Sequence, residues 1–98
     1  MLFALICTDK PGHLQTRLDV RPGHVAFLNG LNERGALIFA GPFLDGDGKP
    51  NGSLVVIEAA DRAAAENIAA SDPYAGAGLF AAVDIRPWNW VFNKPEVA

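Results

Sequence analysis

Short apolar runs separated by turn-forming residues set the pattern of this chain. Runs of this length that stop at glycine, proline or aspartate are typical of buried β-strands. They predict strands at residues 2–8, 36–43, 53–58 and 79–86. The segment 88–92, which carries two tryptophans, is a candidate extension of the last strand.

A first helix is predicted between the first two strands. It begins at Pro22, because proline suits the first helical turn, and it stops at Gly35. His24, Leu28 and Leu31 then share one face, which we expect to pack on the sheet. Residues 9–20 are polar without a clear period, so they are predicted to form a loop in which Leu14 and Leu18 support at most a short helical turn.

A second helix is predicted at residues 63–70, between the last two strands. It is rich in alanine, and Asp61 is suited to cap its N-terminus. Pro73 ends it, because the residue before a proline avoids the helical region. Residues 74–78 are predicted to be a short glycine-containing loop, and residues 45–52 an exposed turn.

The resulting order, β-α-β-β-α-β, is that of the ferredoxin-like α+β fold. This fold is an antiparallel four-stranded sheet with both helices on one face. Most positions on the other face are apolar, so we predict a homodimer in which two sheets pack face to face. Residues 1–98 form one domain in this prediction, with 92–98 as a loose tail.

This topology gathers polar residues from distant parts of the chain at the end of the sheet where the first strand finishes. The residues expected there are Asp9, Arg21, His24, Gly41, Pro42, Asp72 and Tyr74.

His24 is the most informative of these residues. Its predicted place at a helix N-terminus favours a neutral ring, and a carboxylate such as Asp72 would fix its tautomer. A histidine oriented by a carboxylate is the usual general base. The alternative is a half-buried histidine that only packs or caps, and Asp72 has a parallel alternative, because aspartate before proline often caps local N–H groups.

The remaining candidates are predicted to bind the substrate, and they are Asp9, Arg17, Arg21, Gly41, Pro42 and Tyr74. Arg17 and Arg21 are able to clamp a carboxylate or phosphate, although exposed arginines are ordinary. Gly41 and Pro42 would let a ligand approach the backbone, or would simply end a strand. A metal site from His24, Asp72 and Asp9 is a weak alternative, because their spacing carries no metal signature, and no metal is predicted.

Composition excludes several classes of protein. Half of the residues are hydrophobic, 19% are charged and the net charge is −3, which argues against disorder and against binding of nucleic acid. Cys7 is the single cysteine, so neither an intramolecular disulfide nor a zinc site of paired cysteines can form. The glycines of 45–52 match no nucleotide-binding motif, and no cofactor is predicted.

The location is expected to be cytoplasmic. The apolar start of the chain lacks the features of a secretory signal, and no apolar run is long enough to span a bilayer. Cys7 and the tryptophans of 88–92 are expected to be structural, Cys7 in the core and the tryptophans on the dimer face or on a pocket wall. His13 is expected to be exposed.

Four segments together resemble the YciI-like, or YCII-related, family. They are 17–24 (RLDVRPGH), 41–42 (GP), 72–74 (DPY) and 85–88 (IRPW). The resemblance runs from the first strand to Phe92. It implies a dimeric α/β barrel, with an active site built around His24 and Asp72. It also implies a reaction class for some members, the dehydrochlorination of chlorinated hydroquinones.

Two functions remain open from the sequence. In the first, the protein is a small enzyme in which His24 is general acid or base and Asp72 orients it. Arg21 or backbone N–H groups near Gly41 would then hold an oxyanion during elimination, isomerisation or dehydrochlorination of a small organic substrate. In the second, the protein is a non-catalytic binder of small molecules or an accessory dimer module.

Overall fold

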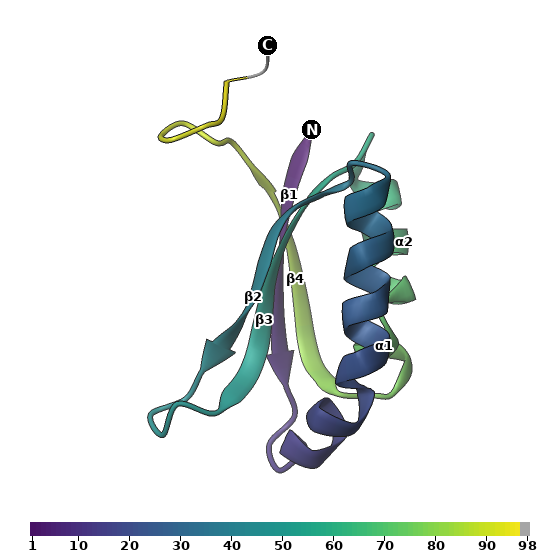
Figure 1. Cartoon of the computed structure of the whole chain (residues 1–98), viewed down its shortest axis with the longest axis vertical. Helices are drawn as coiled ribbons and strands as arrows, with labels where there is room; N and C mark the ends of the chain where they lie inside the picture. The colour runs from purple at the N-terminus through teal and green to yellow at the C-terminus, as the bar shows by residue number, and fades with distance from the viewer. Residues whose placement is uncertain (97–98) are drawn as a thin grey trace.

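The computed structural model describes residues 1–96 and confirms the predicted ferredoxin-like fold (Figure 1). The elements are, in chain order, β1 (Leu2–Asp9), α1 (Leu14–Glu33), β2 (Leu37–Leu44), β3 (Pro50–Glu58), α2 (Arg62–Ser71), α3 (Pro73–Gly76) and β4 (Phe80–Trp88). The strands form one antiparallel sheet in the order β2-β3-β1-β4. Both long helices lie on the same side of this sheet. Among residues 1–96 no helix is long and apolar enough to cross a bilayer.

The core lies between the helices and one face of the sheet. Phe3, Leu5 and Cys7 occupy every second position of β1. They pack with Val55 and Ile57 of β3 against the helices. Side chains alternate between the two faces of a strand, so the residues between these positions point to the side without helices. The single thiol is therefore a core group.

The first helix begins at Leu14, which corrects the predicted loop at 9–20 and the predicted start at Pro22. The buried residues of α1 are Arg17, His24 and Leu31, which follow one another at seven-residue steps along a single stripe. The first of them is an arginine, so the apolar period is not visible there in the sequence. Pro22 lies inside the helix and is exposed, and the first turns lie at an angle to the rest (Figure 1).

The ends of α2 follow the sequence prediction closely. Asp61 caps the helix as expected, because its Oδ1 accepts a hydrogen bond of 2.9 Å from the backbone N–H of Ala64. The predicted loop at 74–78 is different, because its first part continues from Pro73 as the single turn α3. Asp72 precedes that turn and caps it.

The last strand ends at Trp88, so the candidate extension to residue 92 is not part of the sheet. Trp90 nevertheless stays on the sheet, because its ring meets Phe39 of β2 edge-on at 5.4 Å between centroids, and Trp88 meets the same ring at 5.8 Å. Residues 89–96 form neither helix nor strand. Of the predicted tail, residues 97 and 98 lie outside the described part of the chain.

Candidate functional site

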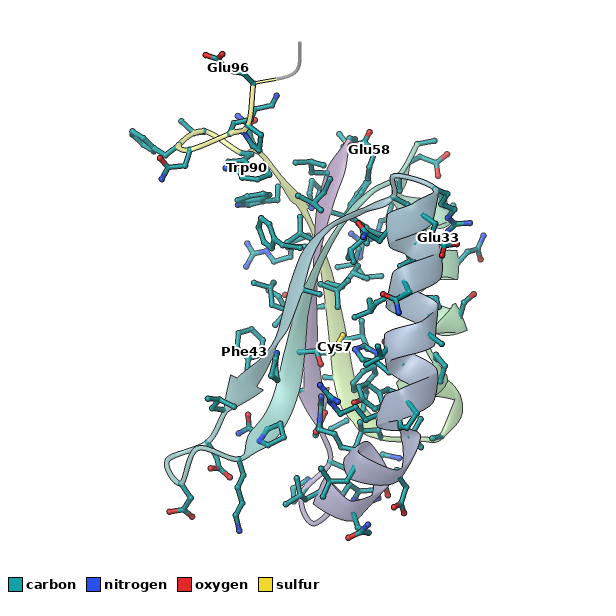
Figure 2. All side chains as sticks on the ribbon, in the orientation of Figure 1. Cys7, Glu33, Phe43, Glu58, Trp90 and Glu96 are labelled. Carbon is teal, nitrogen blue, oxygen red and sulfur yellow. The ribbon has the colours of Figure 1, made fainter. Side chains whose placement is uncertain are left out.

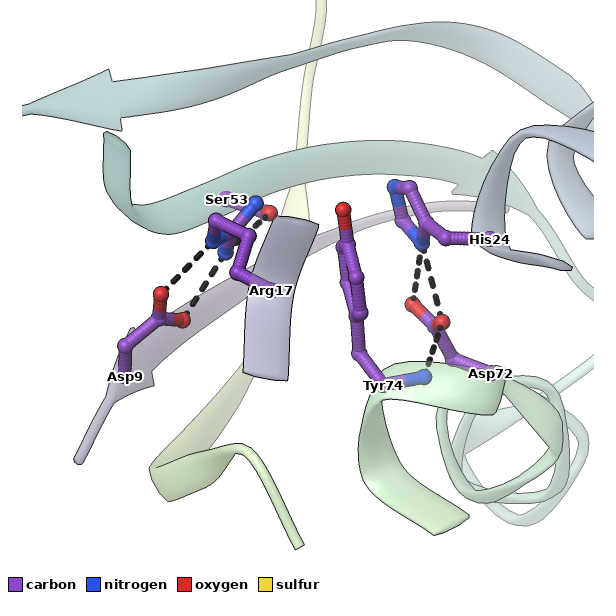
Figure 3. A network of polar contacts seen from close by, with 6 residues as sticks. All are labelled: Asp9, Arg17, His24, Ser53, Asp72 and Tyr74. Atoms are coloured by element: carbon purple, nitrogen blue, oxygen red, sulfur yellow. Dashed lines mark hydrogen bonds and ion pairs between the residues drawn. The ribbon is translucent and has the colours of Figure 1, made fainter. Parts of the chain in front are cut away.

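His24 and Asp72 form a buried pair at the end of the sheet where β1 finishes. Nδ1 of His24 lies 2.9 Å from Oδ1 and 3.0 Å from Oδ2 of Asp72, across 48 residues of sequence (Figure 3). A carboxylate only accepts hydrogen bonds, so Nδ1 carries the proton and donates it. In the neutral ring, Nε2 is then the nitrogen with a free lone pair.

Asp72 has two structural duties at once. Besides contacting His24, its Oδ1 accepts a hydrogen bond of 2.9 Å from the backbone N–H of Tyr74, as an N-cap of α3. This aspartate is therefore a local cap and is also in contact with the histidine. Capping also holds the carboxylate in place, because it fixes one of the two oxygens that face the imidazole.

His24 lies well inside α1, which corrects the expectation that a helix N-terminus acts on it. The helix begins ten residues earlier than this histidine, at Leu14. The field of a helix terminus falls off within the first turn, so it does not reach this ring. The immediate surroundings of His24 are Asp72 and the ring of Tyr74.

A second buried ion pair lies beside the first. Arg17 donates from Nε and Nη2 to the two oxygens of Asp9, at 2.6 and 2.8 Å, and Nη2 also donates to Oγ of Ser53 at 3.0 Å. Only 4% of the Arg17 side chain and 6% of the Asp9 side chain are exposed. Burial works to lower the pKa of the guanidinium, but the hydrogen bonds and the charge of Asp9 raise it above its ordinary value. Arg17 is therefore a fixed cation.

Tyr74 lies between the two ion pairs. Its ring stacks on the imidazole of His24, with 4.0 Å between centroids and 18° between planes. The guanidinium carbon of Arg17 lies 4.6 Å from the centre of the same ring. Figure 3 shows the resulting row, which runs Asp9, Arg17, Tyr74, His24, Asp72.

A cavity of about 260 Å³ opens beside this row, between α1 and the strands β2 and β3. Its polar lining comes from Arg17, Arg21, His24, Ser53 and Tyr74. The rest of the lining is apolar and comes from α1, β2 and β3, with Leu28 and Val55 among its members. Apolar walls with a few convergent polar groups are the usual form of a small-molecule site, and this volume suits a molecule of about one ring.

The structure brings most of the predicted site residues to this cavity. Arg21 is exposed and lines it, and Gly41 and Pro42 line it from β2. Gly41 stands opposite Leu54 in the register, on the face without helices, so only its backbone can reach a ligand in the cavity. Asp9 does not line this cavity, and both of its carboxylate oxygens bind Arg17.

Ser53 is the site residue that the sequence reasoning missed. It is buried and stands on β3 in the same alternation as Val55 and Ile57, which places it on the helix-facing side. A single hydroxyl at a core-facing position directly before the apolar run 54–57 is the signal that marks it. Its partner in the structure is Arg17.

Two other features lie away from this chemistry. Burial raises the pKa of the Cys7 thiol to about 12, which leaves almost no thiolate near neutral pH and excludes it as a nucleophile. A larger and more open groove of about 690 Å³ lies between α1 and α2. The groove contains no histidine and no carboxylate, so we place the site in the smaller cavity beside His24.

Known proteins are similar to this chain in sequence and in fold. The model of the YCII-related domain matches residues 1–89. Protein YciI of Escherichia coli is 37% identical over 98 residues, which cover 94% of this chain and all of that protein. The 5-chloro-2-hydroxyhydroquinone dehydrochlorinase of Burkholderia phenoliruptrix, solved in complex with 2,5-dihydroxybenzoquinone, is 33% identical with a TM-score of 0.84 and covers 91% of this chain and 94% of that one. An antibiotic biosynthesis monooxygenase, 15% identical with a TM-score of 0.54 over 93% of this chain and 99% of its own, shares the fold alone.

Proposed function

Because this chain belongs to the YCII-related family, we propose that it is a small enzyme in which His24 and Asp72 carry out acid/base chemistry on a small organic molecule. The observation that carries the proposal is the buried contact between Nδ1 of His24 and both oxygens of Asp72 beside a cavity. A carboxylate that holds the imidazole in one tautomer leaves Nε2 to take or return a proton.

The reaction class we propose is elimination, isomerisation or dehydrochlorination. In each of these a base removes a proton from the substrate, and negative charge develops on a neighbouring oxygen or leaves with the departing group. The similar protein from Burkholderia is named as a dehydrochlorinase, which supports this class. The cavity of about 260 Å³ with largely apolar walls fits a substrate of one ring.

A test incubates the protein with 5-chloro-2-hydroxyhydroquinone and with a panel of small phenols, hydroquinones and lactones, followed by NMR. We expect at least one compound to be converted by the wild type, and His24→Gln serves as the control for spontaneous conversion. Binding of panel compounds without any conversion would contradict the proposal. That outcome would favour the second function, a binder of small molecules, because the same cavity then serves recognition only.

The proposal includes a homodimer formed through the sheet face that carries no helix. Phe39, Phe43 and Leu54 lie on this face by register, and the two phenylalanines are 38% and 41% exposed. Figure 2 shows Phe43 on the side of the sheet away from α1. Asp84 and Arg86 of β4 stand on the same face with opposite charges, and Glu58, also on this face, pairs with the N-terminal ammonium of Met1. An apolar face without net charge is suited to a second copy of itself.

We expect Phe43→Glu to convert the dimer to single chains, because each interface would then bury two carboxylates on an apolar face. Sedimentation of the wild type should give twice the chain mass, and the variant should give the mass of one chain. Ala63→Glu adds the same charge at an exposed position of α2 and should leave the dimer intact. A wild type that sediments as one chain at micromolar concentration would rule the dimer out.

A further inference from the structure

The ring of Tyr74 lies between the imidazole of His24 and the guanidinium of Arg17, and only 1% of this residue is exposed. It is also the single tyrosine of the chain. We propose that Tyr74 is a third catalytic residue, whose hydroxyl donates a hydrogen bond to the substrate oxygen that lies next to Nε2 of His24. This inference rests on the proposed function and adds to it the group that holds the developing negative charge.

The stacked geometry places the two groups side by side. The rings of Tyr74 and His24 are nearly parallel, at 18°, with 4.0 Å between their centroids. In Figure 3 the hydroxyl of Tyr74 and the ring nitrogen of His24 that does not contact Asp72 point in the same direction. Both residues line the cavity of about 260 Å³. One small molecule in the cavity can therefore meet both groups.

The hydroxyl of Tyr74 makes no hydrogen bond to an acceptor within the row of residues around it. Arg17 offers only donors, and the Asp72 carboxylate is engaged by Nδ1 of His24 and by the backbone N–H of Tyr74. In Figure 3 Tyr74 enters the polar network through that N–H alone. Among the described residues no fully buried side-chain nitrogen or oxygen lacks a partner, so this hydroxyl is in reach of the cavity that Tyr74 lines, and a ligand there would supply its acceptor.

The electrostatic surroundings keep this hydroxyl a donor. Burial raises the pKa of Tyr74 above its ordinary value, while the charges of Arg17 and Arg21 act to lower it. The phenol therefore stays protonated at neutral pH. A cation 4.6 Å from the ring centre also draws electron density from the phenol, which strengthens its O–H as a donor toward a negative oxygen.

In the proposed step His24 takes the proton and Tyr74 stabilises the negative charge that forms. Nε2 of His24 accepts a proton from a carbon or oxygen of the substrate, and the electron pair of the broken bond moves through the conjugated system to a carbonyl oxygen. That oxygen becomes an enolate or phenolate and accepts the hydrogen bond from Tyr74, which keeps its own proton. The arrangement selects substrates in which the acidic hydrogen is conjugated with a carbonyl or phenolic oxygen, and it supplies a donor where charge develops.

The test compares wild type with Tyr74→Phe, which keeps the ring between Arg17 and His24 and removes only the hydroxyl. The assay uses 5-chloro-2-hydroxyhydroquinone or whichever panel compound the wild type converts. We expect kcat to fall by about 10²–10³-fold, the range for loss of one donor to a developing oxyanion, with KM changed much less. Phe80→Leu is the matched control, because Phe80 packs edge-on against the Tyr74 ring at 6.0 Å without carrying a polar group, and its kcat should stay within about threefold.

The outcomes separate this inference from the proposed function. If His24→Gln loses turnover while Tyr74→Phe keeps the wild-type kcat, the role of Tyr74 is overturned and the enzyme assignment stands. If the wild type converts none of the compounds, both are overturned. A fluorine label on the single tyrosine gives an independent readout, since 2,5-dihydroxybenzoquinone should shift its NMR signal in the wild type. An unshifted signal with this compound bound would also overturn the role of Tyr74.

Discussion

Turnover is expected to fall by about 10²–10⁴-fold when His24 is replaced with glutamine or Asp72 with asparagine. Glutamine removes the group that exchanges the proton. Asparagine still accepts the hydrogen bond from the backbone of Tyr74 and so keeps the N-cap of α3, but it no longer presents a carboxylate to Nδ1 of His24. Steady-state kinetics on the converted compound gives the ratio directly.

The two duties of Asp72 can be separated within the same experiment. Asp72→Asn should unfold in urea close to wild type, whereas Asp72→Ala loses the cap as well and should cost about 0.5–2 kcal/mol more. Asp61→Asn is the matched control, because Asp61 caps α2 through a bond of the same length, 2.9 Å, to Ala64 and lies outside the cavity lining. It should keep wild-type turnover. Full activity in Asp72→Asn would show that the carboxylate serves only as a cap.

The second large effect concerns stability, where Asp9→Ala is expected to lower the free energy of unfolding by about 3–5 kcal/mol. The substitution leaves the guanidinium of Arg17 buried with only Ser53 as a hydrogen-bond partner among the contacts in the structure. An uncompensated buried charge is costly because the protein interior cannot replace the water that the charge loses on folding. Urea unfolding followed by tryptophan fluorescence measures the change.

The ion pair on α2 provides the comparison. Arg62 and Glu66 meet at 3.1 Å with side chains 57% and 56% exposed, so Glu66→Ala should change the stability by less than about 1 kcal/mol. Replacing both buried partners, as Asp9→Leu with Arg17→Met, should recover most of the loss, because no charge is then left unpaired. Equal effects of Asp9→Ala and Glu66→Ala would mean that burial does not govern the pair beside the cavity.

The order of elements and the end of the sheet at which the polar residues gather could be predicted from the sequence. Both follow from local signals: apolar runs for the strands, alanine and an aspartate cap for α2, and a glycine that ends α1. Gly35 has the left-handed φ of 73° that a helix-ending glycine adopts. The predicted order placed His24 and Asp72 near the same end, although it did so with a helix that starts at Pro22 and not at Leu14.

The first half of α1 could not be predicted in this way, because its buried position is occupied by Arg17. A pattern of apolar and polar positions predicts that a charged residue is exposed to solvent, unless the residue that forms an ion pair with it is known. That partner, Asp9, lies on β1, and the third member, Ser53, lies on β3. Burial of the arginine depends on all three meeting, which is a property of the packed structure and not of any one segment.

By itself, the sequence determined the fold, the family resemblance and the pair of residues to suspect. Only the tertiary structure decided that His24 and Asp72 touch, that Tyr74 fills the space between them and Arg17, and that Asp9 neutralises Arg17 instead of lining the cavity. The physical reason is the distance along the chain over which the two kinds of interaction act. Strands and helices arise from preferences within a few residues, whereas hydrogen bonds and ring stacking between separate elements depend on distances that are set only when those elements pack.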